Sequence, residues 1–249
     1  MISQNLMDKL LYLRLPAFRE GLREQQTNPQ YAQLSFEERL LLLADLECAR
    51  RMDNRTKRRL KLAEFPLRAS IEDLDFSPTR GLNRQQVLEL AQCIWVDNAL
   101  NIVISGATGT GKSYLACAFG VAACKLGYSV RYLHSARFLH LLSLARKDGS
   151  YLSFLRSLSK NNILILDDWM RDPIQLSAAQ DLLELFDDRF GHSATIIVSQ
   201  VPISEWHARF PDPTLADAIL DRIIHNAYRI SLSGDSQRKL RGFRSMSHT

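Results

Sequence analysis

Eight consecutive residues, Gly106 to Ser113, have the types and spacing needed to hold a nucleotide's phosphates. They read GATGTGKS and fit the pattern G-x-x-x-x-G-K-[ST]. In this pattern the glycines let backbone N–H groups turn toward phosphate oxygens, the lysine adds a positive charge near the β- and γ-phosphates, and the final hydroxyl is a ligand for Mg²⁺. The sequence therefore predicts that the chain binds ATP or GTP together with Mg²⁺.

All eight residues are candidates for phosphate contact: Gly106, Ala107, Thr108, Gly109, Thr110, Gly111, Lys112 and Ser113. A glycine-rich turn that holds no ligand is the alternative, and the flanking sequence argues against it. An apolar run at 101–105 predicts a buried strand before the loop, and 113–125 predicts a compact helix after it. The start of that helix would direct its positive dipole end at the phosphates.

A second strand is expected to bring acid to the same site. Residues 163–168 read ILILDD, an apolar run typical of a buried parallel strand that ends in two carboxylates. We assign Asp167 to Mg²⁺, through water, and Asp168 to orienting or deprotonating the attacking water. An apolar strand that ends in acid is by itself a common way for a loop to begin, and the phosphate loop is what favours the catalytic interpretation.

Three more strands are predicted at 129–133, 195–199 and 228–232, with an amphipathic helix at about 178–190. Strands that alternate with helices indicate an α/β fold, here a parallel sheet of five strands covered on both faces. Polar Ser199 and Gln200 end the fourth strand on the ligand side of this sheet. Either is a candidate to sense the γ-phosphate or hold the water, and the alternative is an ordinary strand-end residue.

The sequence before this core has a helical period. We expect a small helical domain at 1–66, a linker and helix at 67–98, the ATPase core at 99–235 and a basic tail at 236–249. Within the first domain, Ser35 and Glu38 form a capping box that opens a helix running to about Met52.

Seven positive residues occur within 50–61 against one Asp: Arg50, Arg51, Arg55, Lys57, Arg58, Arg59 and Lys61. A solvated helix face is the usual explanation of such a run. The net charge of +5 and a second basic cluster from Arg238 to Arg244 favour contact with the DNA backbone. A third basic segment, 137–160, carries aromatic residues that are equally good candidates for the core.

The pattern as a whole resembles the IstB/DnaC-like branch of the AAA+ ATPases, and within it the IstB transposition helpers of insertion sequences. The resemblance rests on the phosphate loop, Asp167-Asp168, Ser199-Gln200, Pro202, Trp206, Asp221-Arg222, the segments 34–40 and 71–76, and the basic stretch before Phe65-Pro66. Asp168 departs from the Glu usual in the broader AAA+ class.

The resemblance implies an ATPase that assembles as a homo-oligomer on double-stranded DNA and presents the target site to a transposase. It also implies that Arg222 is an arginine finger for a neighbouring subunit's nucleotide. The alternative for Arg222 is a surface ion pair with Asp221 or Asp217. Because only 233–249 follow the last predicted strand, the helical lid of many relatives is expected to be absent or minimal. Arg238 is a candidate substitute sensor or part of the basic tail.

Other classes of protein fit the sequence less well. No signal pattern or long apolar run is present, so we expect a cytoplasmic protein with no membrane partner. The four cysteines lack C-x-x-C spacing and are expected as reduced core residues. No metal-binding histidine pattern or serine-hydrolase motif is found. Three alternatives remain open: a replicative helicase loader of the same branch, a P-loop kinase of a small metabolite, and a DNA-binding module with a vestigial nucleotide site.

Overall fold

The computed structural model describes residues 3–236. The chain divides into two compact units, Met1–Arg58 and Arg59–Thr249, and the division falls inside helix α3 (Phe36–Ala63). This helix was expected to end near Met52, and that expectation is wrong. Its basic second half contains no Gly or Pro, and Arg, Lys and Leu are good helix formers. The helix stops where Glu64 takes a positive φ of 55°, just before Phe65-Pro66.

The first unit is helical. It contains α1 (Gln4–Tyr12), α2 (Pro16–Thr27), a 3₁₀ turn (Pro29–Gln33) and most of α3. The predicted capping box is present: the Ser35 N–H donates to the Glu38 carboxylate at 2.7 Å, and the Glu38 N–H donates to the Ser35 hydroxyl at 3.3 Å. These two bonds satisfy backbone donors that a helix start otherwise leaves without partners.

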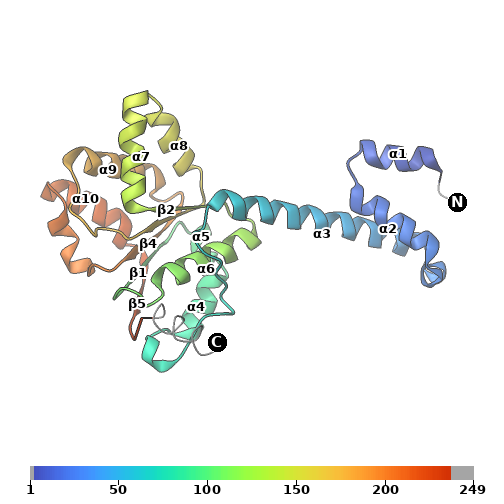
Figure 1. The fold of residues 1–249 in the computed structure, drawn as a ribbon, viewed down its shortest axis with the longest axis horizontal. Coiled ribbons are helices and arrows are strands. Elements are labelled where there is room, and N and C mark those ends of the chain that lie inside the picture. Colours follow the sequence, from blue (N-terminus) through green and yellow to red (C-terminus); the bar gives the residue numbers. More distant parts are fainter. Residues whose placement is uncertain (1–2, 237–249) are drawn as a thin grey trace, which may run out of the picture. The chain divides into compact units, whose positions relative to one another are not determined.

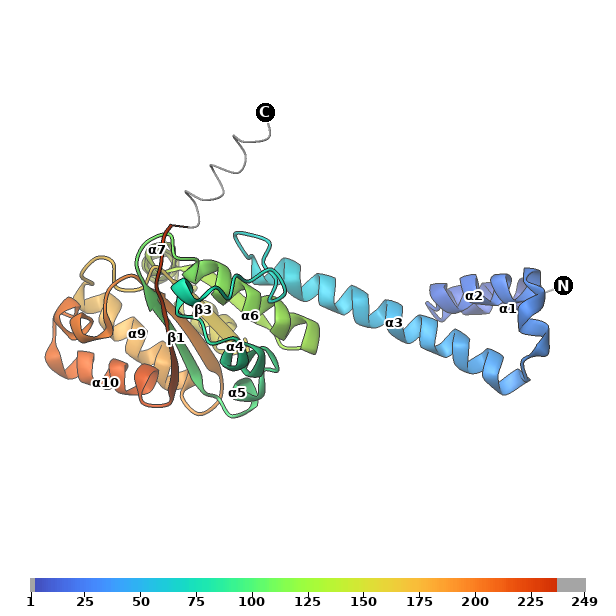
Figure 2. The ribbon, with the colours of Figure 1, turned by 90° about the horizontal axis from the view of Figure 1, so that it is seen from below.

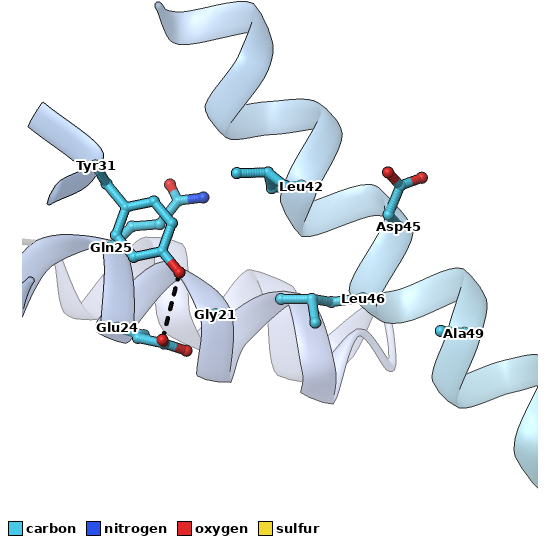
Figure 3. Close-up of a pocket in the computed structure, with 8 residues that line it drawn as sticks. All are labelled: Gly21, Glu24, Gln25, Tyr31, Leu42, Asp45, Leu46 and Ala49. Carbon is cyan, nitrogen blue, oxygen red and sulfur yellow. Dashed lines mark hydrogen bonds between the residues drawn. The ribbon is translucent and has the colours of Figure 1, made fainter. Parts of the chain in front are cut away.

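Helices α2 and α3 pack closely at Gly21. A Cβ at this position would lie 2.7 Å from Leu46 Cδ1 and 2.8 Å from Leu43 Cδ2, so a larger residue would require these leucine side chains to move. Beside this contact is a hollow of about 420 Å³ (Figure 3). Glu24 and Asp45 flank its apolar surface, and the Tyr31 hydroxyl donates to the Glu24 carboxylate.

The second unit is built on a five-stranded sheet in the order β2-β3-β4-β1-β5, and every neighbouring pair is parallel. Its strands are β1 (Asn101–Gly106), β2 (Val130–His134), β3 (Ile163–Asp167), β4 (Ala194–Ser199) and β5 (Ala227–Leu232). All five predicted strands are confirmed, each to within about one residue. The α/β fold with a five-stranded parallel sheet is therefore the one expected from the sequence.

Helices cover both faces of this sheet (Figures 1 and 2). One face carries α4 (Arg84–Ala91), α5 (Ile94–Asp97) and α6 (Lys112–Leu126), and the other carries α7 (Ser135–Asp148), α8 (Tyr151–Ser159), α9 (Leu176–Arg189) and α10 (Pro213–Ile224). Successive residues of β1 alternate between the two layers: Ile102 and Ile104 join the core beneath α6, and Val103 joins the core beneath α9. Three 3₁₀ turns complete the unit, at Pro78–Arg80, Ile203–Glu205 and His207–Arg209.

The basic segment 137–160 uses its aromatic residues for packing. Phe138 is fully buried, and Phe154 packs against the same core. The Arg146 guanidinium lies 4.2 Å from the centre of the Tyr151 ring and pairs with the buried carboxylate of Asp181. These contacts favour the core interpretation of the aromatic residues over a role in DNA contact.

Three of the four cysteines, Cys93, Cys117 and Cys124, are buried thiols, as expected. Burial raises the pKa of Cys117 to about 12, with a further contribution from the charge of Asp167. The expectation is wrong for Cys48, which is exposed on α3.

Only Ser233 to Ser236 follow β5 within the described part of the chain, and they form no helix. The basic tail with Arg238, Lys239, Arg241 and Arg244 lies outside the described residues. Over residues 3–236, no helix has the length and apolar character required to cross a membrane.

Candidate functional site

The loop between β1 and α6 needs glycine at three positions. Gly106, Gly109 and Gly111 have φ angles of 144°, 85° and 93°, which other residues rarely adopt. At Gly106 a Cβ would also lie 2.2 Å from the Leu232 carbonyl oxygen of β5. The loop therefore has a backbone conformation that only this glycine pattern permits.

Lys112 opens helix α6 and folds back toward the loop. Its side chain is buried, and Nζ donates to the Ala107 carbonyl oxygen at 2.8 Å. The Thr110 hydroxyl donates to the same oxygen at 2.8 Å, which holds the loop in a tight ring. Ser113 is the next residue of the helix and is half-buried. The predicted charge and hydroxyl are thus both at the start of α6, where the helix dipole is positive.

Asp167, at the end of β3, is 6% exposed and held in a fixed orientation. Tyr132 of β2 donates its hydroxyl to Asp167 Oδ2, and the Asp168 N–H donates to Oδ1 at 2.8 Å. Burial, followed by the charge of Asp167, raises the pKa of Tyr132 far above its usual value. Tyr132 therefore remains a proton donor to this carboxylate. Sequence reasoning missed it because the pairing of β2 with β3 is not visible in the sequence.

Asp168 has left the strand and takes a positive φ of 57°. Its Oδ2 accepts from Arg171 Nη1 at 2.9 Å and lies 3.3 Å from His134 Nε2. Neither Arg171 nor His134 was predicted at the site. The register of β2 with β3 sets His134 opposite Asp167, and this pairing explains how His134 reaches the acid end.

Gln200 follows β4 and contacts the phosphate loop directly. The Thr108 hydroxyl donates to Gln200 Oε1 at 2.5 Å. Ser199 differs from it, because its buried hydroxyl donates to the Trp169 carbonyl oxygen and accepts from the Val201 N–H. Since β4 lies between β1 and β3, Gln200 is between the phosphate loop and the acidic pair.

Arg222, near the end of α10, lies at the amino-terminal end of β1, which is the end opposite the phosphate loop. The Arg222 carbonyl oxygen accepts a hydrogen bond from the Asn101 side chain at 2.9 Å. Asn101 is the first residue of β1, and the phosphate loop begins at the last residue of the same strand. The strand between them is about 17 Å long, at about 3.3 Å per residue. The Arg222 side chain is 29% exposed and pairs with Asp187 of α9, not with the expected alternatives Asp221 or Asp217.

Six of the seven predicted DNA-contacting cations fall into two groups. In the first, Arg50 pairs with Glu20 at 3.3 Å, Arg51 with Glu47 at 2.9 Å and Lys57 with Asp53 at 2.6 Å. In the second, Arg55, Arg58 and Lys61 are exposed, and they have no ion pair within residues 3–236. Arg59 is half-buried, with Nη2 3.8 Å from the position that a Cβ on Gly127 would take.

The sheet order, the glycine loop after β1 and the acidic end of β3 together define a P-loop NTPase fold of the AAA+ type. The chain belongs to the family of IstB-like ATP-binding proteins, whose model matches residues 8–245.

Comparisons with known proteins agree with this assignment. An insertion sequence ATP-binding protein of Sinorhizobium fredii is 42% identical over 96% of this chain and 98% of its own length. The ATP-binding protein of insertion sequence IS1162 from Pseudomonas fluorescens is 41% identical over 86% of this chain and 95% of its own. Among solved structures, the DnaC helicase loader superposes with a TM-score of 0.57 over 66% of this chain and 97% of its own, at 14% identity. At this identity the likeness concerns the fold alone.

Proposed function

We propose that this protein binds and hydrolyses ATP at the loop between β1 and α6. The observation that carries the proposal is the convergence of three strand ends: the glycine loop after β1, Asp167 and Asp168 at the end of β3, and Gln200 after β4. Open parallel sheets bind their ligands at this edge. Membership of an ATP-binding family supports ATP over GTP as the nucleotide.

In this proposal the loop N–H groups and Lys112 bind the phosphates, and Ser113 and Asp167 hold Mg²⁺. The residues fit these roles. The loop leaves no room for a Cβ at Gly106, and the donors assigned to Mg²⁺ are hydroxyl and carboxylate oxygens, the atoms that this ion prefers. Bound Mg²⁺ would neutralise the charge that develops on the phosphates. The hydrogen bond from the Tyr132 hydroxyl fixes the orientation of the Asp167 carboxylate.

Hydrolysis requires a water molecule aligned with the γ-phosphate. Asp168 accepts the water's proton or orients it, and Gln200 contributes a second polar group from the adjacent strand end. Arg222 is separated from its own loop by the length of β1, so in this proposal it acts on the nucleotide of a second copy of the chain. Such an arginine stabilises the charge of the transition state.

We further propose that the ATPase works as a homo-oligomer on double-stranded DNA and assists a transposase. The names of the relatives place them in insertion sequences, and the exposed cations Arg55 and Arg58 offer contacts for phosphate backbones. A helicase loader would share the fold but would require a surface that binds a replicative helicase. A small-metabolite kinase would turn over as a monomer and independently of DNA.

The test is the rate of ATP hydrolysis with and without duplex DNA, for the native protein, Lys112→Ala and Lys125→Ala. Lys125 is the matched control because it lies near the other end of α6 and is exposed. We expect the native protein and Lys125→Ala to hydrolyse ATP, faster with DNA, and Lys112→Ala to lose both binding and turnover. Hydrolysis by Lys112→Ala at the native rate would overturn the assignment of the site. A hydrolysis rate of the native protein that is the same with and without DNA would contradict the DNA-dependent function.

A further inference from the structure

Arg80 lies against the phosphate loop, although it precedes the sheet in the chain. Arg80 is 5% exposed, and its Nη2 donates to the Thr110 carbonyl oxygen at 2.6 Å. The same nitrogen is 3.0 Å from the position that a Cβ on Gly111 would take. The guanidinium therefore contacts two residues of the loop, and glycine at 111 leaves the space that it occupies.

The backbone of Arg80 is fixed by residues that follow β5. The Ser233 N–H donates to the Arg80 carbonyl oxygen, and the Ser233 hydroxyl donates to the Thr79 carbonyl oxygen, both at 3.1 Å. Gly81 then turns the chain with a φ of 65°. The arginine is thus held in place by a short turn tied to the sheet, and little rotational freedom remains to be lost when a ligand binds.

The charge of Arg80 has no counterpart among the described residues. None of the ion pairs found in residues 3–236 includes Arg80, and its Nε is buried without a hydrogen-bond partner. A buried cation without a compensating anion is costly, and arginine does not escape the cost by losing its proton. An anion bound in the adjacent loop would supply the missing negative charge.

We propose that Arg80 is a second cation of the nucleotide site, which recognises the polyphosphate and keeps the loop in its binding conformation. This inference rests on the proposed function, since it requires that the loop binds a nucleotide. Arg80 is a positioning residue that acts on the phosphates through its charge and through Thr110. The contribution of Arg80 to nucleotide affinity must therefore increase with the number of phosphates and must not depend on the base.

The experiment compares dissociation constants for ATP, ADP and AMP with Mg²⁺ in the native protein, Arg80→Gln, Arg80→Lys and Arg84→Gln. Arg84 is the matched control, a nearby arginine that is exposed and lies over the Phe76 ring. We expect Arg80→Gln to weaken ATP binding by about tenfold, the effect of one nearby charge, and to weaken ADP less and AMP least. Arg80→Lys keeps the charge and should retain most of the affinity, and Arg84→Gln should bind as the native protein does.

Thermal unfolding without nucleotide establishes that each variant is folded, and Arg80→Met is the neutral replacement if the Gln protein unfolds. Equal weakening of all three nucleotides, or equal weakening by Lys and Gln, would show that Arg80 only shapes the loop and would overturn the proposal. Native affinity in the neutral variant would overturn it as well. If the native protein binds no nucleotide, the proposed function itself fails, a result distinguishable from the others because it needs no variant.

Discussion

The hydroxyl of Thr108 in the phosphate loop donates a hydrogen bond to the side-chain oxygen of Gln200, at 2.5 Å. The two residues are 92 positions apart in the chain, and the contact exists because β4 lies beside β1 in the sheet. Through it, the loop that would surround the phosphates is joined to the polar residue that ends the neighbouring strand. In the proposed function, Gln200 would therefore lie beside the γ-phosphate.

This contact leads to a prediction for Gln200→Ala. We expect ATP hydrolysis to fall by about 10²-fold, the usual cost of removing a polar group aimed at the transition state. ATP affinity should remain within a few-fold of native because the loop and Lys112 are intact. Steady-state hydrolysis and ATP titration measure the two effects, and Gln175→Ala, an exposed glutamine before α9, is the control. A native rate in Gln200→Ala would reduce Gln200 to an ordinary strand-end residue.

The assignment of Asp168 predicts that Asp168→Asn still binds ATP but hydrolyses it about 10²- to 10⁴-fold more slowly, because the amide cannot accept the water's proton. Asp172→Asn is the matched control, since Asp172 is an exposed partner of the same Arg171. Single-turnover hydrolysis and ATP binding are the measurements. If both variants slow hydrolysis equally, the effect comes from freeing Arg171 and not from losing a base.

Arg222→Ala should retain ATP affinity and lose hydrolysis by about 10³-fold or more, as expected of an arginine finger. Asp187→Asn is the control, because it breaks the same ion pair between α9 and α10 while leaving the arginine in place. We expect Asp187→Asn to remain active. Similar losses in both variants would assign Arg222 to stabilising the helix pair.

Mixing Arg222→Ala with Lys112→Ala protein should restore activity, because some interfaces would pair an intact arginine with an intact loop. The hydrolysis rate across mixing ratios is the measurement, with mixed assembly verified separately. Activity that stays absent in every ratio would show that Arg222 does not act across subunits.

The basic part of α3 predicts salt-dependent DNA binding. Replacing Arg55 and Arg58 with Gln should weaken binding to unrelated duplexes and reduce the salt slope of log K by about 1.8, or about 0.9 for each phosphate that is no longer neutralised. Arg50 and Arg51 are the comparison pair, since they already pair with Glu20 and Glu47, and their replacement should change the slope less. Native affinity and native slope after the Arg55 and Arg58 replacement would leave this stretch as a solvated helix face.

Much of the core could be predicted from local patterns. Apolar runs indicated the three inner strands β1, β3 and β4, because a strand that is buried on both faces needs an unbroken apolar segment. The outer strands β2 and β5 contain Arg131 and Arg229, and their positions after predicted helices helped to indicate them. The end of α3 was predicted too early because a charged helix without an apolar stripe gives no periodic pattern to follow. Cys48 was misplaced for a related reason: the apolar residues around it lie on a helix that leaves many of them exposed.

The sequence by itself determined the phosphate loop and the acidic end of β3, since each depends on residues that are neighbours in the chain. It also determined the family, which rests on several such short motifs along the chain. Only the tertiary structure decided that β4 separates β1 from β3 and that Tyr132 donates a hydrogen bond to Asp167. It also decided that Arg80 contacts the phosphate loop and that Arg222 lies at the opposite end of β1. These relationships arise from strand order and register, which the packing of the whole sheet sets. A short motif contains no information about which distant segment will lie beside it.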